Sequence, residues 1–133
     1  MATIWVLQHH AEPPDGQWTP TYDLARQLVK RGHRVTIFAS GFSHYAKIET
    51  RLGARQLSLT KDFEGVQFVF LKTKSYVRND WRRALNMLSY SLAAVWTGVR
   101  LRERPDVVIG STPHPFAPLA GLVLAWIKRS RFF

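Results

Sequence analysis

Two apolar segments flank one helical pattern near the start of the chain, and this order constrains the fold more than any other feature. Residues 3–8 and Val35–Ala39 are apolar nearly throughout, as expected of parallel strands that are covered on both faces. Between them, Thr19 is an expected N-cap, Pro20 the first helical residue and Gly32 a left-handed stop. A strand, a helix and a second strand in this order predict the right-handed crossover unit of an α/β domain.

The rest of the chain continues this alternation. Arg55–Thr60 and Val66–Leu71 are the expected strands of a β-hairpin with its loop at residues 61–65. The pattern between Gly41 and Gly53 is weak and indicates one short helix, Tyr45–Leu52. Three further elements are expected, namely a helix over Trp81–Arg102, a buried strand over Asp106–Gly110 and a last helix from about Pro115 to Lys128.

Strands that alternate with helices predict one α/β domain over residues 1–133. We expect a Rossmann-like, doubly wound and mostly parallel sheet, with helices on both faces and the β-hairpin as an insertion.

The helix expected over Trp81–Arg102 carries an apolar stripe. It is formed by Trp81, Leu85, Leu88, Leu92, Val95, Trp96 and Val99. We expect this stripe to pack on the sheet, and contact with a membrane surface is the alternative. Neither this helix nor Phe116–Ile127 has the roughly 20 predominantly apolar residues that a membrane span needs.

The chain is strongly basic. It has 19 Lys and Arg against 9 Asp and Glu, a net charge of +10 and a pI near 10.7. This excess favours anionic partners, such as phosphates, an acidic membrane surface or nucleic acid, and a solvated basic surface is the alternative. No groove-reading helix and no aromatic-studded surface for single strands is indicated, so we expect no nucleic-acid partner.

The chain has no cysteine, which excludes disulfides and thiolate metal sites. Its first residues enter an apolar run without a basic region or a small-residue cleavage site. A secretory signal is therefore not expected, and the expected location is the cytoplasm.

Polar residues follow the expected strands where ligands bind in open α/β sheets, outside the carboxyl ends of the strands. The loops after residues 8, 39, 71 and 110 carry His9, His10, Asp15, Gly16, Ser40, Lys72, Lys74, Ser111 and His114. These loops therefore predict a cleft at one edge of the sheet.

The first of these loops has neither a dinucleotide fingerprint nor a Walker A motif. Gly16, placed before a helix, can present backbone N–H groups to a phosphate, although most such glycines only turn the chain. His9 and His10 are adjacent on an expected extended segment, so their side chains should point to opposite sides. No carboxylate completes a ligand set around them, and we expect no metal.

The polar loop after the last buried strand has little reason to be there for packing alone. It contains Ser111 and His114, and His114 is the better candidate among the histidines. Gly110–Pro113 is not a nucleophile elbow, so hydrolysis by an activated serine is not indicated.

Two segments resemble the amino-terminal domain of family 4 glycosyltransferases, which have the GT-B fold. Residues 22–40, preceded by Pro-Pro-Asp-Gly, contain Ala-Arg-x-Leu-x-x-Arg-Gly-His, a pattern shared by many GT-B enzymes. Residues 105–120 begin Pro-Asp-Val-Val-Ile-Gly-Ser-Thr-Pro-His-Pro-Phe and are similar to the branch that builds bacterial surface polysaccharides and lipid-linked glycans.

The resemblance implies the acceptor-side half of a retaining, metal-independent transferase that uses no cofactor. Such an enzyme moves a sugar from a nucleotide sugar to a glycan or a lipid-linked acceptor. It implies that the donor domain and the last part of this domain are missing, so that the chain alone is inactive and a second chain supplies the donor site. The alternative is a non-catalytic remnant or partner subunit that binds a glycosyl or lipid-phosphate ligand, or a second chain.

The resemblance also implies roles for single residues. Gly16 matches the glycine loop that approaches the donor phosphate, although many members have paired glycines there. Family members often have a histidine near the transferred sugar; a direct count places Ser111 at that position and His114 three residues later. Both are therefore catalytic candidates.

For the acceptor site the candidates are His9, His10, Asp15 and Ser40. A lipid-linked acceptor implies a protein on the inner face of an anionic membrane.

Overall fold

A computed structural model describes residues 1–13, 19–43, 48–49, 51–53, 55–75, 80–111 and 115–133. Its elements are β1 (Thr3–Leu7), α1 (Pro20–Lys30), β2 (Arg34–Ser40), β3 (Phe42–Ser43), β4 (Ile48–Glu49), β5 (Ser58–Phe63), β6 (Val66–Leu71), α2 (Trp81–Arg100), β7 (Val107–Gly110), α3 (Phe116–Lys128) and β8 (Arg131–Phe132).

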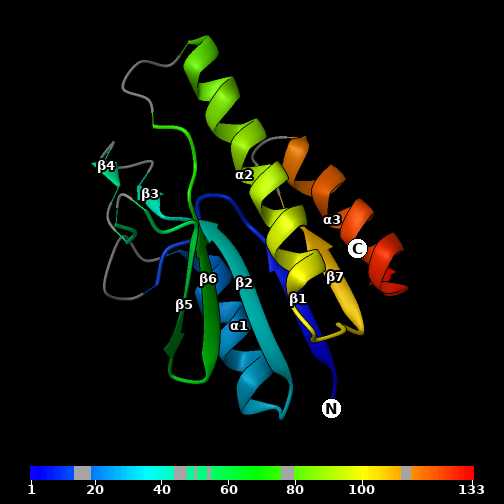
Figure 1. The fold of residues 1–133 in the computed structure, drawn as a ribbon. Coiled ribbons are helices and arrows are strands. Elements are labelled where there is room, and N and C mark those ends of the chain that lie inside the picture. The colour runs from blue at the N-terminus through cyan, green and yellow to red at the C-terminus, as the bar shows by residue number, and fades with distance from the viewer. Residues whose placement is uncertain (14–18, 44–47, 50, 54, 76–79, 112–114) are drawn as a thin grey trace.

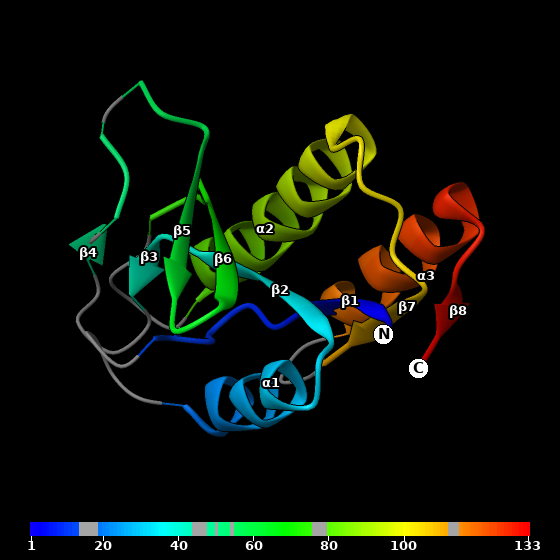
Figure 2. The same cartoon turned by 90° about the horizontal axis from the view of Figure 1, so that it is seen from below.

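The main sheet has six strands in the order β5-β6-β2-β1-β7-β8. All neighbours are parallel except β5, which pairs antiparallel with β6. Helix α1 covers one face, while α2 and α3 lie side by side on the other (Figures 1 and 2). This arrangement confirms the predicted Rossmann-like, mostly parallel sheet with helices on both faces.

Each face of the sheet has its own hydrophobic core. On the α1 face, Tyr22 and Ala25 of the helix are buried with Ile37 and Phe68 of the sheet. On the α2–α3 side the core contains Trp5, Leu7, Phe38, Val69, Leu71, Tyr90, Ala94, Val108, Ala117, Ala120, Leu124 and Ala125. Because β1 and β2 contribute to both cores, their uninterrupted apolar composition follows from burial on both faces.

Helix α1 begins and ends at the predicted residues, but its N-cap hydroxyl does not cap the helix. At its C-terminus, Gly32 has φ +91° and the His33 N–H donates to the Leu28 carbonyl at 3.1 Å, which is the pattern of a Schellman motif. At its N-terminus, Thr19 occupies the N-cap position but its hydroxyl caps no helix N–H. That hydroxyl bonds instead to the backbone N–H and carbonyl of Glu12, both at 3.2 Å.

The hairpin between β5 and β6 is tighter than predicted. Strand β5 continues to Phe63, and Phe63 pairs with Val66. The turn is therefore Glu64 and Gly65 alone, both with positive φ, as in the two-residue turns whose twist matches that of the strands. The expected loop over residues 61–65 is wrong because most of it belongs to the strand.

The short helix expected over Tyr45–Leu52 is wrong where the structure describes that segment. Ile48–Glu49 forms β4, which pairs antiparallel with Phe42–Ser43 of β3. Residues 44–47 and 50 lie outside the described residues.

Helix α2 packs on the sheet through the face opposite the apolar stripe that was predicted to pack there. The buried residues are Asn86, Tyr90, Ser91, Ala94 and Gly98. The apolar stripe is instead largely exposed, with Trp81, Leu85, Leu88, Leu92, Trp96 and Val99 all open to solvent. None of the described helices has the length and apolar composition that crossing a membrane requires.

The reason for this orientation is the close packing of α2. A Cβ added at Gly98 would lie 2.7 Å from a methyl carbon of Leu124 and 3.3 Å from the Trp5 ring. Tyr90, about two helical turns earlier, reaches the sheet and donates its hydroxyl proton to the Phe38 carbonyl at 2.5 Å. A row of small and hydrogen-bonding residues therefore fits against the sheet better than the leucines do.

We expect Gly110→Ala to destabilise the domain by about 2 kcal/mol or more, because the added methyl group would overpack the contact between β7 and α3. Its Cβ would lie 2.6 Å from the Pro118 Cα, a backbone atom that no rotamer change can move. The free energy of unfolding in urea measures the effect.

Gly53→Ala is the matched control, since its Cβ would meet only the Gln56 Oε1 at 3.6 Å. It should change stability by less than about 0.5 kcal/mol. Equal effects of the two substitutions would contradict the assigned close contact.

Candidate functional site

The carboxyl ends of β1, β2, β6 and β7 meet at one edge of the sheet (Figure 1). The residues after these strands are joined by backbone hydrogen bonds. Ser40 N–H donates to the His9 carbonyl, and Ser111 N–H donates to the Leu7 carbonyl, both at 3.0 Å. The structure thus brings together the loops from which the sequence predicts a cleft.

His9 and His10 stack on one another rather than pointing to opposite sides. Their ring centroids are 4.4 Å apart, and the His9 ring lies parallel to that of Tyr90 at 4.4 Å. The prediction is wrong because the chain turns here, with Ala11 N–H donating to the Gln8 carbonyl at 3.2 Å. His9 is only 1% exposed, so the stack joins the β1 loop to α2.

Tyr90 is the fixed member of this stack. Burial raises the pKa of its phenol well above its ordinary value, so the hydroxyl stays protonated at physiological pH. It donates to the Phe38 carbonyl, and this bond anchors the ring against which His9 lies.

A buried polar network lies beneath the same edge. The hydroxyl oxygens of Ser40 and Thr73 are 2.7 Å apart. Asn86 Nδ2 donates to Thr73 Oγ1 at 3.0 Å and to the Lys74 carbonyl at 2.6 Å, while Ser40 Oγ accepts the Phe42 N–H at 3.0 Å. The network therefore connects the ends of β2 and β6 to helix α2.

Two amide oxygens at this edge have no hydrogen-bond donor among the described residues. Asn86 Oδ1 and Gln8 Oε1 are buried and accept no hydrogen bond from the part of the chain that the structure describes. Asn86 is 1% exposed. Buried acceptors of this kind cost free energy when no donor reaches them. Because both atoms are almost fully covered, a ligand hydroxyl would reach them only after a neighbouring side chain moves aside.

Thr73, Asn86 and Tyr90 are members of the site that the sequence analysis missed. Asn86 and Tyr90 lie four residues apart, in a row that continues through Ala94 and Gly98. That row runs along the helix opposite the leucine stripe, and its spacing is the signal that could have identified it.

Three of the predicted site residues, Asp15, Gly16 and His114, lie outside the described residues. Ser111 is half-buried directly after β7. Of the basic residues, Lys72 donates from Nζ to the Gly53 carbonyl at 3.2 Å, and Lys74 is exposed. Among the described side chains, no three His, Asp or Glu residues gather as a metal-ligand set.

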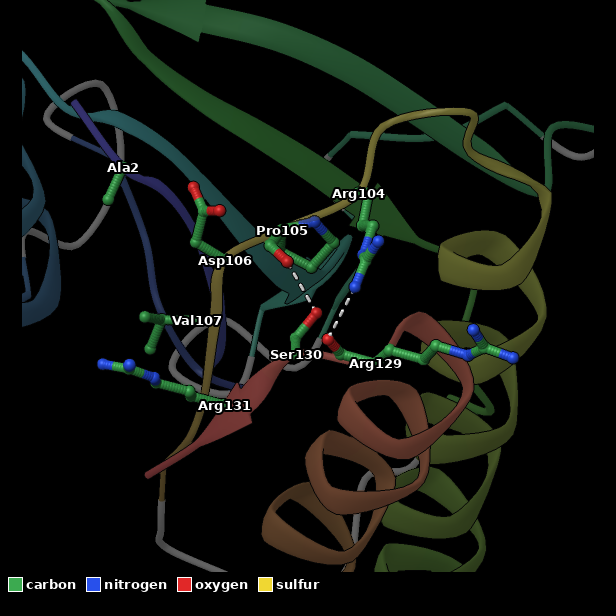
Figure 3. A pocket seen from close by; sticks show the side chains of 8 residues that line it. All are labelled: Ala2, Arg104, Pro105, Asp106, Val107, Arg129, Ser130 and Arg131. Atoms are coloured by element: carbon green, nitrogen blue, oxygen red, sulfur yellow. Dashed lines mark hydrogen bonds between the residues drawn. The ribbon is translucent and has the colours of Figure 1, made fainter.

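A cavity of 720 Å³ opens at the opposite edge of the sheet, near the amino ends of β1, β7 and β8. Figure 3 shows its arginines pointing in different directions, with Arg104 turned toward the Arg129 carbonyl at 3.0 Å. Ser130 donates to the Pro105 carbonyl at 2.6 Å, and Asp106 accepts the Thr3 N–H at 2.7 Å. These hydrogen bonds join the segments at the amino ends of the strands. The polar groups that line the cavity are therefore already used in folding, and the cavity is not assigned as the candidate site.

Comparison with known proteins gives one family. The model of Glycosyltransferase Family 4 matches residues 14–132, which is all but the start and the last residue of the chain. No curated protein matches the chain. The match includes every element from α1 to β8 and so concerns most of the domain rather than one motif.

We expect Thr73→Val to destabilise the domain by about 1–3 kcal/mol, because it removes the hydroxyl that joins Ser40 to Asn86 while keeping the side-chain shape. Chemical denaturation measures the loss. Thr60→Val, at an exposed position of β5, is the control and should stay within about 0.5 kcal/mol of the wild type. A Thr73 variant as stable as this control would show that the network adds nothing to the fold.

Proposed function

The chain belongs to glycosyltransferase family 4, and we propose that it is the acceptor-side domain of a retaining, metal-independent transferase. In this proposal the enzyme moves a sugar from a nucleotide sugar to a glycan or a lipid-linked acceptor. The observation that carries the proposal is the family match over residues 14–132, and the polar groups of Ser40, Thr73 and Asn86 at the strand ends are neutral. Neutral acceptors without a counter-charge suit sugar hydroxyl groups, which donate hydrogen bonds and carry no charge.

The arrangement of these groups supports the same ligand class. Hydrogen bonds among Ser40, Thr73 and Asn86 hold their polar groups in place before a ligand arrives. The stack of His9 and His10 on Tyr90 adds a rigid aromatic surface at the same edge. A rigid polar site lowers the entropy cost of binding a flexible glycan.

Roles for the remaining candidates follow from their places in the sequence. We propose that His9, His10, Asp15 and Ser40 form the acceptor side of the cleft. Ser111 and His114, in the loop after β7, are proposed to lie at the reacting sugar.

Gly16, before α1, is proposed to let the donor phosphate approach the backbone. The roles of Gly16, Ser111 and His114 are carried over from the family resemblance, whereas the acceptor candidates are chosen for their places after the strands.

We further propose that the nucleotide sugar is held by a second Rossmann-like unit, either on another chain or in a longer protein. The two phosphates of such a donor need a dedicated site, and the described strand ends offer neutral groups more than charged ones. Residues 1–133 alone are therefore proposed to bind acceptor without turnover, and no cofactor is needed.

Saturation-transfer NMR on the purified chain tests the proposal with a panel of glycans, lipid-phosphate glycans and nucleotide sugars. We expect at least one glycan acceptor to bind, and we expect Ser111→Ala to weaken that binding about three- to tenfold through the loss of one hydrogen bond. Ser58→Ala, at an exposed position of β5, is the matched control and should leave binding unchanged.

Two results would contradict the proposal. Steady sugar transfer by the chain alone would show that the donor site is already present. Failure of every glycan to bind a folded chain would remove the acceptor role. Binding that persists without turnover after a donor unit is added would favour a non-catalytic partner subunit.

A further inference from the structure

Helices α2 and α3 expose a continuous apolar surface to solvent, which we call the α2–α3 face. It is formed mainly by Leu88, Leu92, Trp96 and Val99 of α2 with Leu119 and Trp126 of α3. Trp126 is 81% exposed, Leu92 63% and Trp96 60%. Soluble monomers rarely leave so many large apolar side chains together in water, and such surfaces mark contacts with a protein or a membrane.

The two helices also enclose an apolar groove of about 470 Å³. They run side by side on the same face of the sheet (Figure 1). Leu88 and Val95 line the groove from α2, and Phe116 and Val123 line it from α3. The hydroxyl of Ser91 in its wall already donates to the Met87 carbonyl at 3.2 Å. The groove therefore offers contact area but few groups that would recognise a polar partner.

The charged residues within the two helices have one sign. Neither α2 nor α3 contains an Asp or Glu. Arg82 and Arg83 lie at the start of α2 and Arg100 at its end, while Lys128 ends α3. The Arg100 guanidinium lies over the Trp96 ring, 5.1 Å from its centre. Tryptophan beside a basic side chain is typical of helices that lie at a lipid headgroup region.

The nearest carboxylates are engaged elsewhere. Asp80 accepts the Arg82 N–H at 3.0 Å as the N-cap of α2. Glu103 accepts the Trp5 indole N–H at 2.6 Å and pairs with Arg34 at 3.1 Å. The four basic residues outnumber these two carboxylates, so the border of the apolar face has a net positive charge.

This border decides between two possible occupants. A second copy of the chain would place basic helix ends against basic helix ends in either relative orientation, because both ends of α2 are cationic. An anionic lipid surface instead attracts every basic residue of the border and accepts the leucine and tryptophan side chains at its acyl boundary.

We propose that the α2–α3 face docks on an anionic lipid surface, with both helices lying in the plane of the headgroups. The leucine and tryptophan side chains enter the acyl boundary, and Arg82 and Arg100 contact the phosphates. The Lys128 ammonium stays hydrogen-bonded to the Leu101 and Glu103 carbonyls and adds its charge from there. In Figure 1 the first part of α2 extends past the carboxyl ends of the strands, so this docking brings lipid beside the cleft. The inference goes beyond the proposed sugar transfer and does not depend on it.

Flotation of the chain with vesicles tests this docking. The probes are vesicles of phosphatidylcholine alone and of phosphatidylcholine mixed with phosphatidylglycerol. We expect binding to the mixed vesicles only, and weaker binding at high salt because salt screens the headgroup charge. Replacing two exposed side chains in Leu92→Ser/Trp126→Ser should lower the partition coefficient at least about tenfold.

Matched controls lie on the opposite face of the sheet. Leu24 is 59% exposed on α1, and Leu24→Ser should leave vesicle binding unchanged. Arg100→Gln should weaken binding about fivefold through the loss of one charge at the surface, whereas Arg31→Gln at the exposed end of α1 should not. Circular dichroism should show the same fold in all variants, since each replaced side chain is exposed.

Three outcomes overturn the proposal. Equal binding to neutral and anionic vesicles removes the role of charge. Equal losses in the Leu92/Trp126 and Leu24 variants move the contact off this face. A wild-type dimer in light scattering that the Leu92/Trp126 variant dissociates, without any vesicle binding, assigns the face to a second copy of the chain.

Discussion

The close approach of α2 and α3 to the sheet is the constraint on which the rest of the structure depends. It is possible because three glycines stand at the contacts: Gly98 of α2 against Leu124, Gly110 of β7 against Pro118, and Gly121 of α3 against Gly110. These contacts leave no room for a leucine side chain. The leucines of α2 therefore face outward, and Asn86 and Tyr90 reach the ends of the strands. Both the candidate site and the exposed apolar face follow from this packing.

Much of the fold could be predicted from the sequence, because its signals are local. The apolar runs of β1 and β2 and the Gly32 stop depend on the residues that form them and their immediate neighbours. The orientation of α2 does not. Periodicity identifies the apolar side of a helix, but it does not tell whether that side meets the core or a partner outside the domain. The prediction that the stripe packs on the sheet fails for this reason.

The candidate site, too, could be predicted from the sequence only in part. The rule that ligands bind at the carboxyl ends of parallel strands correctly brings His9, Ser40 and Ser111 to one edge. It does not identify Asn86, because an asparagine inside a helix usually faces water, and only the tertiary contact with Thr73 shows its burial. The stacking of His9 on His10 also escaped prediction, since it depends on a turn that no glycine or proline marks within the pair.

The two sides of α2 differ in how well they tolerate amino-acid substitution. The row of Asn86, Tyr90, Ala94 and Gly98 is held by contacts within the domain, so most replacements there would be lost through unfolding. The stripe on the other side contributes little to folding, because its side chains are already in water. During evolution, selection can therefore act on that stripe for the surface it meets without altering the geometry at the strand ends. One helix in this way lets its exposed stripe and its buried row change independently between descendants of the same domain.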